Sequence, residues 1–187
     1  MEDYVLYRPE VTRFQDLHLN FCGYEACNPL HSFGPAVRPN YIIHCVLEGR
    51  GLYRSGEKTW QLGPGDGFLI RPGELTFYQA DASDPWTYLW IGFEGKLAPV
   101  IMRNLGLGDA GLAFHCGETE ELKKIVLTML KHSTCSEANT LLLESQLYLF
   151  LSVLMREAQP DPSQEDEKGN INVSAAEEYI RNVNGVS

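Results

Sequence analysis

The segment from about residue 20 to 95 consists of short apolar and β-branched runs that are separated by glycine and proline. The clearest run is YIIHCVL at 41–47, and the aromatic run WTYLWIGF at 86–93 closes the series. Between them lie LYRS (52–55), TWQL (59–62), FLIR (68–71) and LTFYQA (75–80). Glycine and proline at such intervals mark turns between strands. The short connections leave little room for crossover helices, so the pattern predicts a mainly antiparallel sandwich or barrel.

After Gly95 the spacing of the apolar residues becomes helical. The segment 119–133 has apolar residues on one face and lysines on the opposite face, which predicts an amphipathic helix. A second helix is predicted over 137–158, with Ser136 as its N-cap and an apolar middle on nearly every side. A helix of that kind must be covered on more than one face.

The second predicted helix supplies a candidate homodimer interface. Leu143, Leu147, Phe150 and Leu154 follow the spacing of a coiled-coil seam. One barrel covers only part of such a helix, and leucines left in water would cost about 25 cal/mol per Å2 of apolar area. We therefore expect the helix of a second copy to contact this seam. Complete coverage by the first helix and the barrel is the alternative.

Residues 1–158 are expected to form one domain, since a chain of 187 residues holds one sizeable core. The segment 159–173 contains PDPSQEDEKGN, which combines prolines and acids without a hydrophobic residue and is typical of a linker. An amphipathic pattern then restarts at Ser174. We expect 174–187 to be the start of a truncated helix-turn-helix DNA-binding domain.

The net charge of −10 and the pI near 4.9 disfavour contact with phosphate backbones, so the chain by itself is not expected to bind DNA. No apolar run approaches the ~20 residues of a membrane helix, and the acidic start does not resemble a signal peptide. A cytoplasmic protein without a membrane partner is the expectation. The five cysteines are odd in number and lack paired C-x2-C spacing, so reduced thiols are favoured over a metal or disulfide role.

Two of the predicted strands carry the candidate binding chemistry. By the period of two, Trp86, Tyr88 and Trp90 share one face of their strand, and Thr76 and Tyr78 share a face of another. These rings have polar edges, and a buried Tyr hydroxyl or Trp N–H needs a partner that a bound polyol can supply. The pattern favours a small-molecule site. Rings that only fill a small barrel are the alternative.

Three segments, YIIHCVLEGRG, WQLGPGDGFLIRPGELTFYQAD and DPWTYLWIGFEG, occur in this order. Together they resemble the N-terminal domain of AraC-family transcription regulators, in the branch that controls the use of sugars and oligosaccharides. The resemblance implies a cupin-like antiparallel β-barrel (jelly roll) over about residues 20–95, followed by two helices. It also implies an effector inside the barrel, a homodimer, and DNA binding only through a missing C-terminal domain.

The same resemblance points to individual residues of the effector site. The sugar contacts of the arabinose-responsive family member fall on Tyr78, Tyr88 and Trp90 of this sequence. Its arginine contact has two rival counterparts here. With the neighbouring tryptophan included, the ligand-binding candidates are Tyr78, Tyr88, Trp90, Trp86, Arg38 and His31. The expected effector is a mono- or oligosaccharide.

The cupin enzymes hold a metal through a His-x-His pair, a Glu and a later His. The first corresponding stretch, GLYRSGEKTWQLGPG, contains no histidine, and the position of the later histidine falls near Thr76. We therefore expect no metal, no other cofactor and no enzyme activity. A metal-independent cupin enzyme that acts on a sugar and a dimerisation module with a filled barrel stay open as alternatives.

Overall fold

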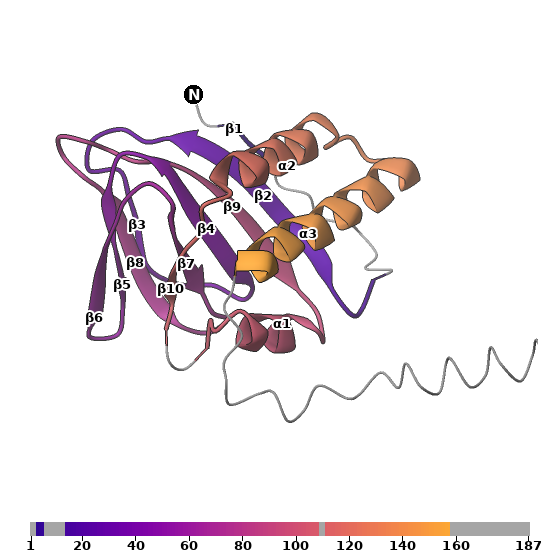
Figure 1. Cartoon of the computed structure of the whole chain (residues 1–187), viewed down its shortest axis with the longest axis horizontal. Coiled ribbons are helices and arrows are strands. Elements are labelled where there is room, and N and C mark those ends of the chain that lie inside the picture. Colours follow the sequence, from indigo (N-terminus) through magenta and orange to yellow (C-terminus); the bar gives the residue numbers. More distant parts are fainter. Residues whose placement is uncertain (1–2, 6–13, 109–110, 158–187) are drawn as a thin grey trace, which may run out of the picture.

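The computed structural model describes residues 3–5, 14–108 and 111–157 and contains two antiparallel sheets that face each other (Figure 1). The strands are β1 (Asp3–Val5), β2 (His18–Ala26), β3 (Ser32–Val37), β4 (Tyr41–Glu48), β5 (Gly51–Ser55), β6 (Lys58–Leu62), β7 (Asp66–Ile70), β8 (Leu75–Ala80), β9 (Thr87–Glu94) and β10 (Ala113–His115). One sheet has the order β1-β2-β9-β4-β7-β10, and the other has the order β3-β8-β5-β6. The expected mainly β, cupin-like architecture is confirmed.

Strands β4 and β9 form the middle of the larger sheet, and their register separates two kinds of side chain. His44 pairs with Trp90, and the next pair along, Ile43 with Ile91, points to the opposite face. The first pair faces the smaller sheet. The second pair is fully buried and faces the helices, since α2 packs against β2, β4 and β9.

Three helices follow the barrel strands: α1 (Ala98–Asn104), α2 (Thr119–Lys131) and α3 (Glu137–Glu157). The two predicted helices are therefore present, and Figure 1 shows them side by side on the outer face of the larger sheet. The apolar face of α2 is buried through Leu122, Ile125, Val126 and Met129. The sequence pattern missed α1 and β10, which have seven and three residues and are too short for a visible period. The expected linker and DNA-binding segment lie outside the described residues.

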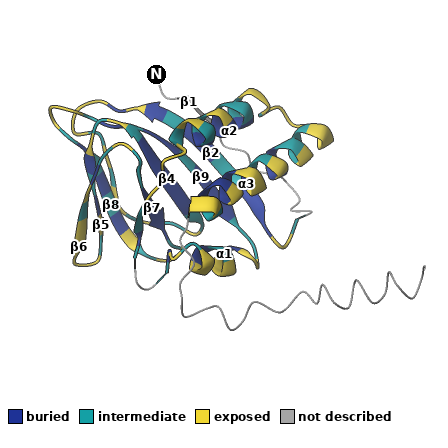
Figure 2. Cartoon of the chain, in the orientation of Figure 1, coloured by how far each residue is buried: buried dark blue, intermediate teal, exposed yellow. Residues whose placement is uncertain are grey.

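The expected dimer seam lies in the core of the chain itself. Leu143, Leu147, Phe150 and Leu154 are only 0–4 % exposed, because α3 packs this face against α2 and β2. The large apolar side chains that α3 leaves in solvent are Leu141, Tyr148 and Leu149, and exposed residues follow the outer side of the helix in Figure 2. The seam chosen from the sequence is therefore covered without a partner.

Helix α3 is also long and apolar enough to cross a membrane by length and composition, the only such helix in the described part of the chain. The core helix of a soluble protein satisfies the same test. In α3 the residues from Leu143 to Leu154 include a continuous set of buried positions, which face α2 and β2. This packing accounts for part of its apolar composition, since 39 % of the apolar stretch is buried.

A buried carboxylate ties α3 to the sheet. Leu19 of β2 pairs with Phe93 of β9 on one side. Strand β1 pairs only with residues 22–24 of β2, so the opposite edge of β2 has no strand partner at Leu19 among the described residues. The backbone N–H of Leu19 instead donates to Glu144, at 3.2 Å from Oε2 and 3.3 Å from Oε1. Burial raises the pKa of Glu144 to about 7, while this hydrogen bond and nearby His18 act in the opposite direction. The link is therefore sensitive to pH.

Glu144 by itself makes the free energy of unfolding fall as the pH rises from about 5 to 8, whereas the buried, neutral imidazole of His44 makes it rise up to about pH 6.5. Glu144 ionises near pH 7 in the folded chain but near 4.5 in the unfolded chain, so the folded state holds the proton over a range in which the unfolded state has released it. Glu144→Gln keeps an acceptor for Leu19 without a charge. It should remove most of this fall and be more stable than the parent at pH 8, by up to about 3 kcal/mol.

Chemical denaturation at pH 5, 6.5 and 8 measures this effect. The matched control is Glu57→Gln, a substitution at an exposed turn residue, which should leave the pH dependence as in the parent. Equal pH slopes for the parent and Glu144→Gln would show that the carboxyl group of Glu144 does not carry the effect.

Candidate functional site

A cluster of aromatic side chains occupies the space between the two sheets. Its members are His44, Tyr53, Phe68, Tyr78, Trp86, Tyr88 and Trp90. The imidazole of His44 lies at the centre: its ring is 4.4 Å from that of Phe68 in a parallel stack, 5.0 Å from Tyr78 and 5.4 Å from Tyr88. The inner faces of β4, β7, β8 and β9 therefore meet at this histidine.

The structure brings together the four aromatic residues that the sequence singles out. The ring of Tyr88 lies 5.7 Å from Trp86, 5.3 Å from Trp90 and 6.2 Å from Tyr78. Trp86 stands one residue before β9 and keeps the alternation of that strand. Three of the four are nearly inaccessible, whereas Trp90 is partly exposed. The predicted common face is thus present, and its role in binding remains a proposal.

His31 and Arg38, the two polar candidates, are connected to this cluster through different neighbouring side chains. His31 Nε2 lies 3.7 Å from Glu25 Oε1, and Glu25 Oε2 accepts a hydrogen bond of 3.3 Å from the hydroxyl of Tyr88. The guanidinium of Arg38 lies 4.0 Å from the ring centre of Phe33, which in turn stacks on Tyr78 at 5.7 Å. Both residues are therefore one side chain away from the aromatic cluster.

Burial keeps the polar groups of the cluster neutral. It lowers the pKa of His44 to about 3, with the positive charge of Arg38 acting in the same direction. Burial also raises the pKa of Tyr78 to about 12, and it raises that of Tyr88 further, together with the neighbouring Tyr78. At neutral pH the imidazole can donate one hydrogen bond and accept another, and both phenols keep their protons.

Two buried polar atoms of the cluster lack a hydrogen-bond partner among the described residues: Nε1 of Trp86 and Nδ1 of His44. An unpaired buried polar group costs roughly 1–3 kcal/mol, so such atoms are usually satisfied by water or a ligand. The sequence pattern leaves open whether His44 faces the cavity or the outer surface, and it does not indicate Glu25. Their place in the cluster follows from strand register, His44 opposite Trp90 and Glu25 opposite Tyr88, which the sequence pattern does not contain.

A glycine makes room for the indole of Trp90. Gly23 is the residue of β2 that pairs with Trp90, and a Cβ atom built on it would lie 2.0 Å from Cζ2 of the indole. Real side chains do not approach so closely. The ring of Trp90 therefore lies across the backbone of β2, and a residue without a side chain is required beneath it.

The segment that contains this cluster matches a known family of binding domains. The family model of the AraC-like ligand binding domain matches residues 18–151. The chain belongs to this family. Relatives of the domain include the Msm operon regulatory protein of Streptococcus mutans, 37 % identical over 144 residues, and the raffinose operon transcriptional regulatory protein RafR of Pediococcus pentosaceus, 31 % identical over 172 residues. The lactose operon transcription activator of Staphylococcus xylosus is 28 % identical over 135 residues.

These alignments cover 76 %, 85 % and 72 % of this chain but only 51 %, 57 % and 48 % of the three relatives, so the domain spans about half of their length. Solved structures similar to the domain include a cupin 2 conserved barrel domain protein from Salinispora arenicola. It is 14 % identical, with a TM-score of 0.40 over 52 % of this chain and 77 % of that one. An apo ToxT variant from Vibrio cholerae is 9 % identical, with a TM-score of 0.49 over 75 % of this chain and 59 % of that one.

Gly23→Ala is expected to displace the indole of Trp90, because the new methyl group would overlap the ring. The overlap should cost about 1–3 kcal/mol of stability and change the tryptophan fluorescence of the folded domain. Gly63→Ala is the matched control, since its Cβ would meet nothing within 4 Å. Thermal unfolding and emission spectra of both variants test this account, and a Gly23→Ala variant with parental stability and spectrum would contradict it.

Proposed function

We propose that this domain is the effector-sensing part of a cytoplasmic transcription regulator and binds a saccharide at the aromatic cluster. The observation that carries the proposal is the combination of aromatic faces with neutral polar groups, including the unpaired Nε1 of Trp86 and Nδ1 of His44. Sugars offer C–H faces for stacking and hydroxyls for hydrogen bonds. DNA is contacted by another part of the regulator, in keeping with the charge of −10 on this chain.

The effector is proposed to contain a galactosyl unit. Two of the relatives are named after raffinose and lactose operons, and both of these sugars contain galactose. The axial hydroxyl of galactose leaves a continuous C–H face on one side of the ring, which suits an indole. Trp90 is the partly exposed indole of the cluster and supplies this surface. The hydroxyls of Tyr78 and Tyr88 and the imidazole of His44 then serve the sugar hydroxyls.

Calorimetric titration with raffinose, melibiose, lactose and galactose, with maltose and trehalose for comparison, tests this proposal. Galactosides should bind preferentially and be recovered unchanged, as a non-catalytic sensor requires. Tyr78→Phe and Tyr88→Phe should each weaken binding by about tenfold, because each removes one hydrogen bond that is worth ~1 kcal/mol or more. Tyr41→Phe is the control, since Tyr41 stacks on Phe93, which faces the helices.

Two results would overturn the saccharide site. Parental affinity in both phenylalanine variants would place the sugar elsewhere. No binding by any of the sugars, with no rise in thermal stability, would favour a barrel that is filled by its own side chains, because a ligand of the folded state must raise stability.

We propose further that the domain forms a homodimer through the exposed stripe of α3. Leu141, Tyr148 and Leu149 are 41–57 % exposed and lie on one side of the helix. Two copies related by a two-fold axis bring the same stripe together from both sides, which buries these side chains without a further partner. This stripe replaces the buried seam that the sequence indicated.

Leu149→Glu is expected to convert the dimer to a monomer, because it places a charge in the proposed contact without touching the core. Sedimentation at tens of micromolar measures the mass. Leu75→Glu is the control. Leu75 is 60 % exposed and lies on β8 of the smaller sheet, whereas α3 packs against the larger sheet. A monomeric parent, or a Leu149→Glu variant that stays dimeric, would contradict this interface.

A further inference from the structure

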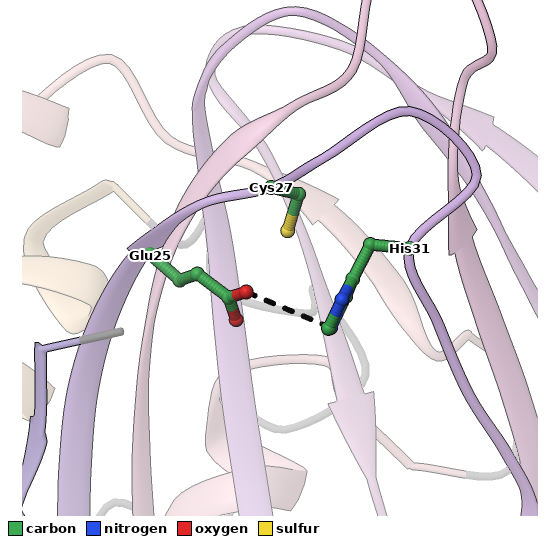
Figure 3. Close-up of side chains that lie close together, drawn as sticks. All are labelled: Glu25, Cys27 and His31. Atoms are coloured by element: carbon green, nitrogen blue, oxygen red, sulfur yellow. Dashed lines mark ion pairs between the residues drawn. The ribbon is translucent and has the colours of Figure 1, made fainter. Parts of the chain in front are cut away.

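Three side chains of different chemistry converge beside the aromatic cluster, at the turn between β2 and β3. Glu25 Oε, Cys27 Sγ and the imidazole of His31 all lie within 4.8 Å of one another. Figure 3 shows that the carboxylate and the imidazole point toward each other, and that the thiol points into the same space. We propose that Glu25, Cys27 and His31 form a binding site for a zinc ion. It lies at another place than the cupin metal position considered above and adjoins the proposed saccharide site through the hydrogen bond from Tyr88 to Glu25.

The chemistry of this group suits zinc. A thiolate, an imidazole and a carboxylate are the three protein ligand types that zinc prefers, and sites with three protein ligands complete the tetrahedron with a water molecule. The thiolate selects against magnesium and calcium, which prefer oxygen alone. One thiolate and one carboxylate together also balance the charge of a divalent cation.

The spacing of the atoms suits the same ion. His31 Nε2 lies 3.7 Å from Glu25 Oε1, which is too long for a hydrogen bond. Two ligand atoms of one tetrahedral zinc ion lie about 3.3–3.8 Å apart, given metal–ligand distances of about 2.0–2.3 Å. The ligand atoms of the three side chains all lie within 4.8 Å of one another. The distances between them therefore need to shorten by at most about 1 Å to match a tetrahedral zinc ion.

The backbone holds the three residues in place. Glu25 and Cys27 are two residues apart on an extended chain and so point the same way, and both are only 8 % exposed. The turn that follows returns His31, whose N–H donates to the carbonyl of Asn28 at 3.0 Å. Leu30 takes a positive φ of 61° in this turn, a conformation that is unfavourable for a branched side chain.

Both ends of the turn are also tied to the rest of the barrel. The N–H of Cys27 donates to the carbonyl of Trp86 at 3.1 Å, and the carbonyl of His31 accepts from the N–H of Ala80 at 2.9 Å. The turn is therefore fixed against β8 and the start of β9 before any ion arrives. A site that is organised in advance loses little conformational freedom when it binds a metal.

Cobalt(II) substitution tests the site directly, because a cobalt–thiolate bond gives a charge-transfer band in the near ultraviolet. The metal-free chain should bind one equivalent of Co2+ or Zn2+ and ignore Mg2+, with a band that disappears in Cys27→Ser. Cys135→Ser is the matched control, since Cys135 is exposed and lies before α3. His31→Gln should weaken zinc binding by more than ~100-fold, because loss of an outer partner alone costs ~10–100-fold.

Several outcomes would overturn the site. These are the absence of a thiolate band, a band that survives in Cys27→Ser or vanishes in Cys135→Ser, and parental zinc affinity in His31→Gln. Glu25 and His31 would then be an ordinary carboxylate–imidazole pair. If Cys27→Ser fails to fold, His31→Gln decides the question, because the side chain of His31 is 31 % exposed and its loss disturbs little packing.

Discussion

The structure depends on the alternation of side chains along β4 and β9. Each strand lies in the middle of the larger sheet and has both faces covered, one by the smaller sheet and one by α2. On the inner face stand His44, Tyr88 and Trp90, and on the outer face stand aliphatic residues such as Ile43 and Leu89. A shift of one residue in register would exchange the two faces and bury polar edges against aliphatic side chains. The barrel and the helical layer are therefore fixed by the same strands.

The inner face of β4 and β9 buries polar groups, whereas their outer face buries mainly aliphatic side chains. Aliphatic side chains on the helical side need only close packing, whereas the rings inside carry hydroxyl, imidazole and indole groups that must find partners. Tyr53 is satisfied within the chain, since its hydroxyl donates to the carbonyl of Leu69 at 2.8 Å. Trp86 and His44 are not satisfied in this way among the described residues. This contrast between neighbouring rings distinguishes the scaffold of the cluster from the part that suits a ligand.

The sequence pattern predicts the strands from 41 to 93, the two long helices and the shared face of Trp86, Tyr88 and Trp90, because each of these depends on a local period. Strand β2 is less visible, since Gly23 and Glu25 interrupt its apolar pattern. Contacts such as His44 with Phe68 depend on which strands pair, which a local period does not specify. The seam of α3 shows the same limit: the period identifies an apolar stripe without telling whether a partner or the chain's own core covers it.

The two faces of β9 can change separately as the sequences of such domains evolve. Tyr88 and Trp90 belong to the aromatic cluster that is proposed to bind the effector, while Leu89 between them lies on the side of the helices. Substitutions at the even-numbered positions can therefore alter which molecule is recognised and leave the helical layer as it is. Substitutions at the odd-numbered positions affect stability first. One scaffold can in this way change its inner face in single steps while the helical layer keeps its packing.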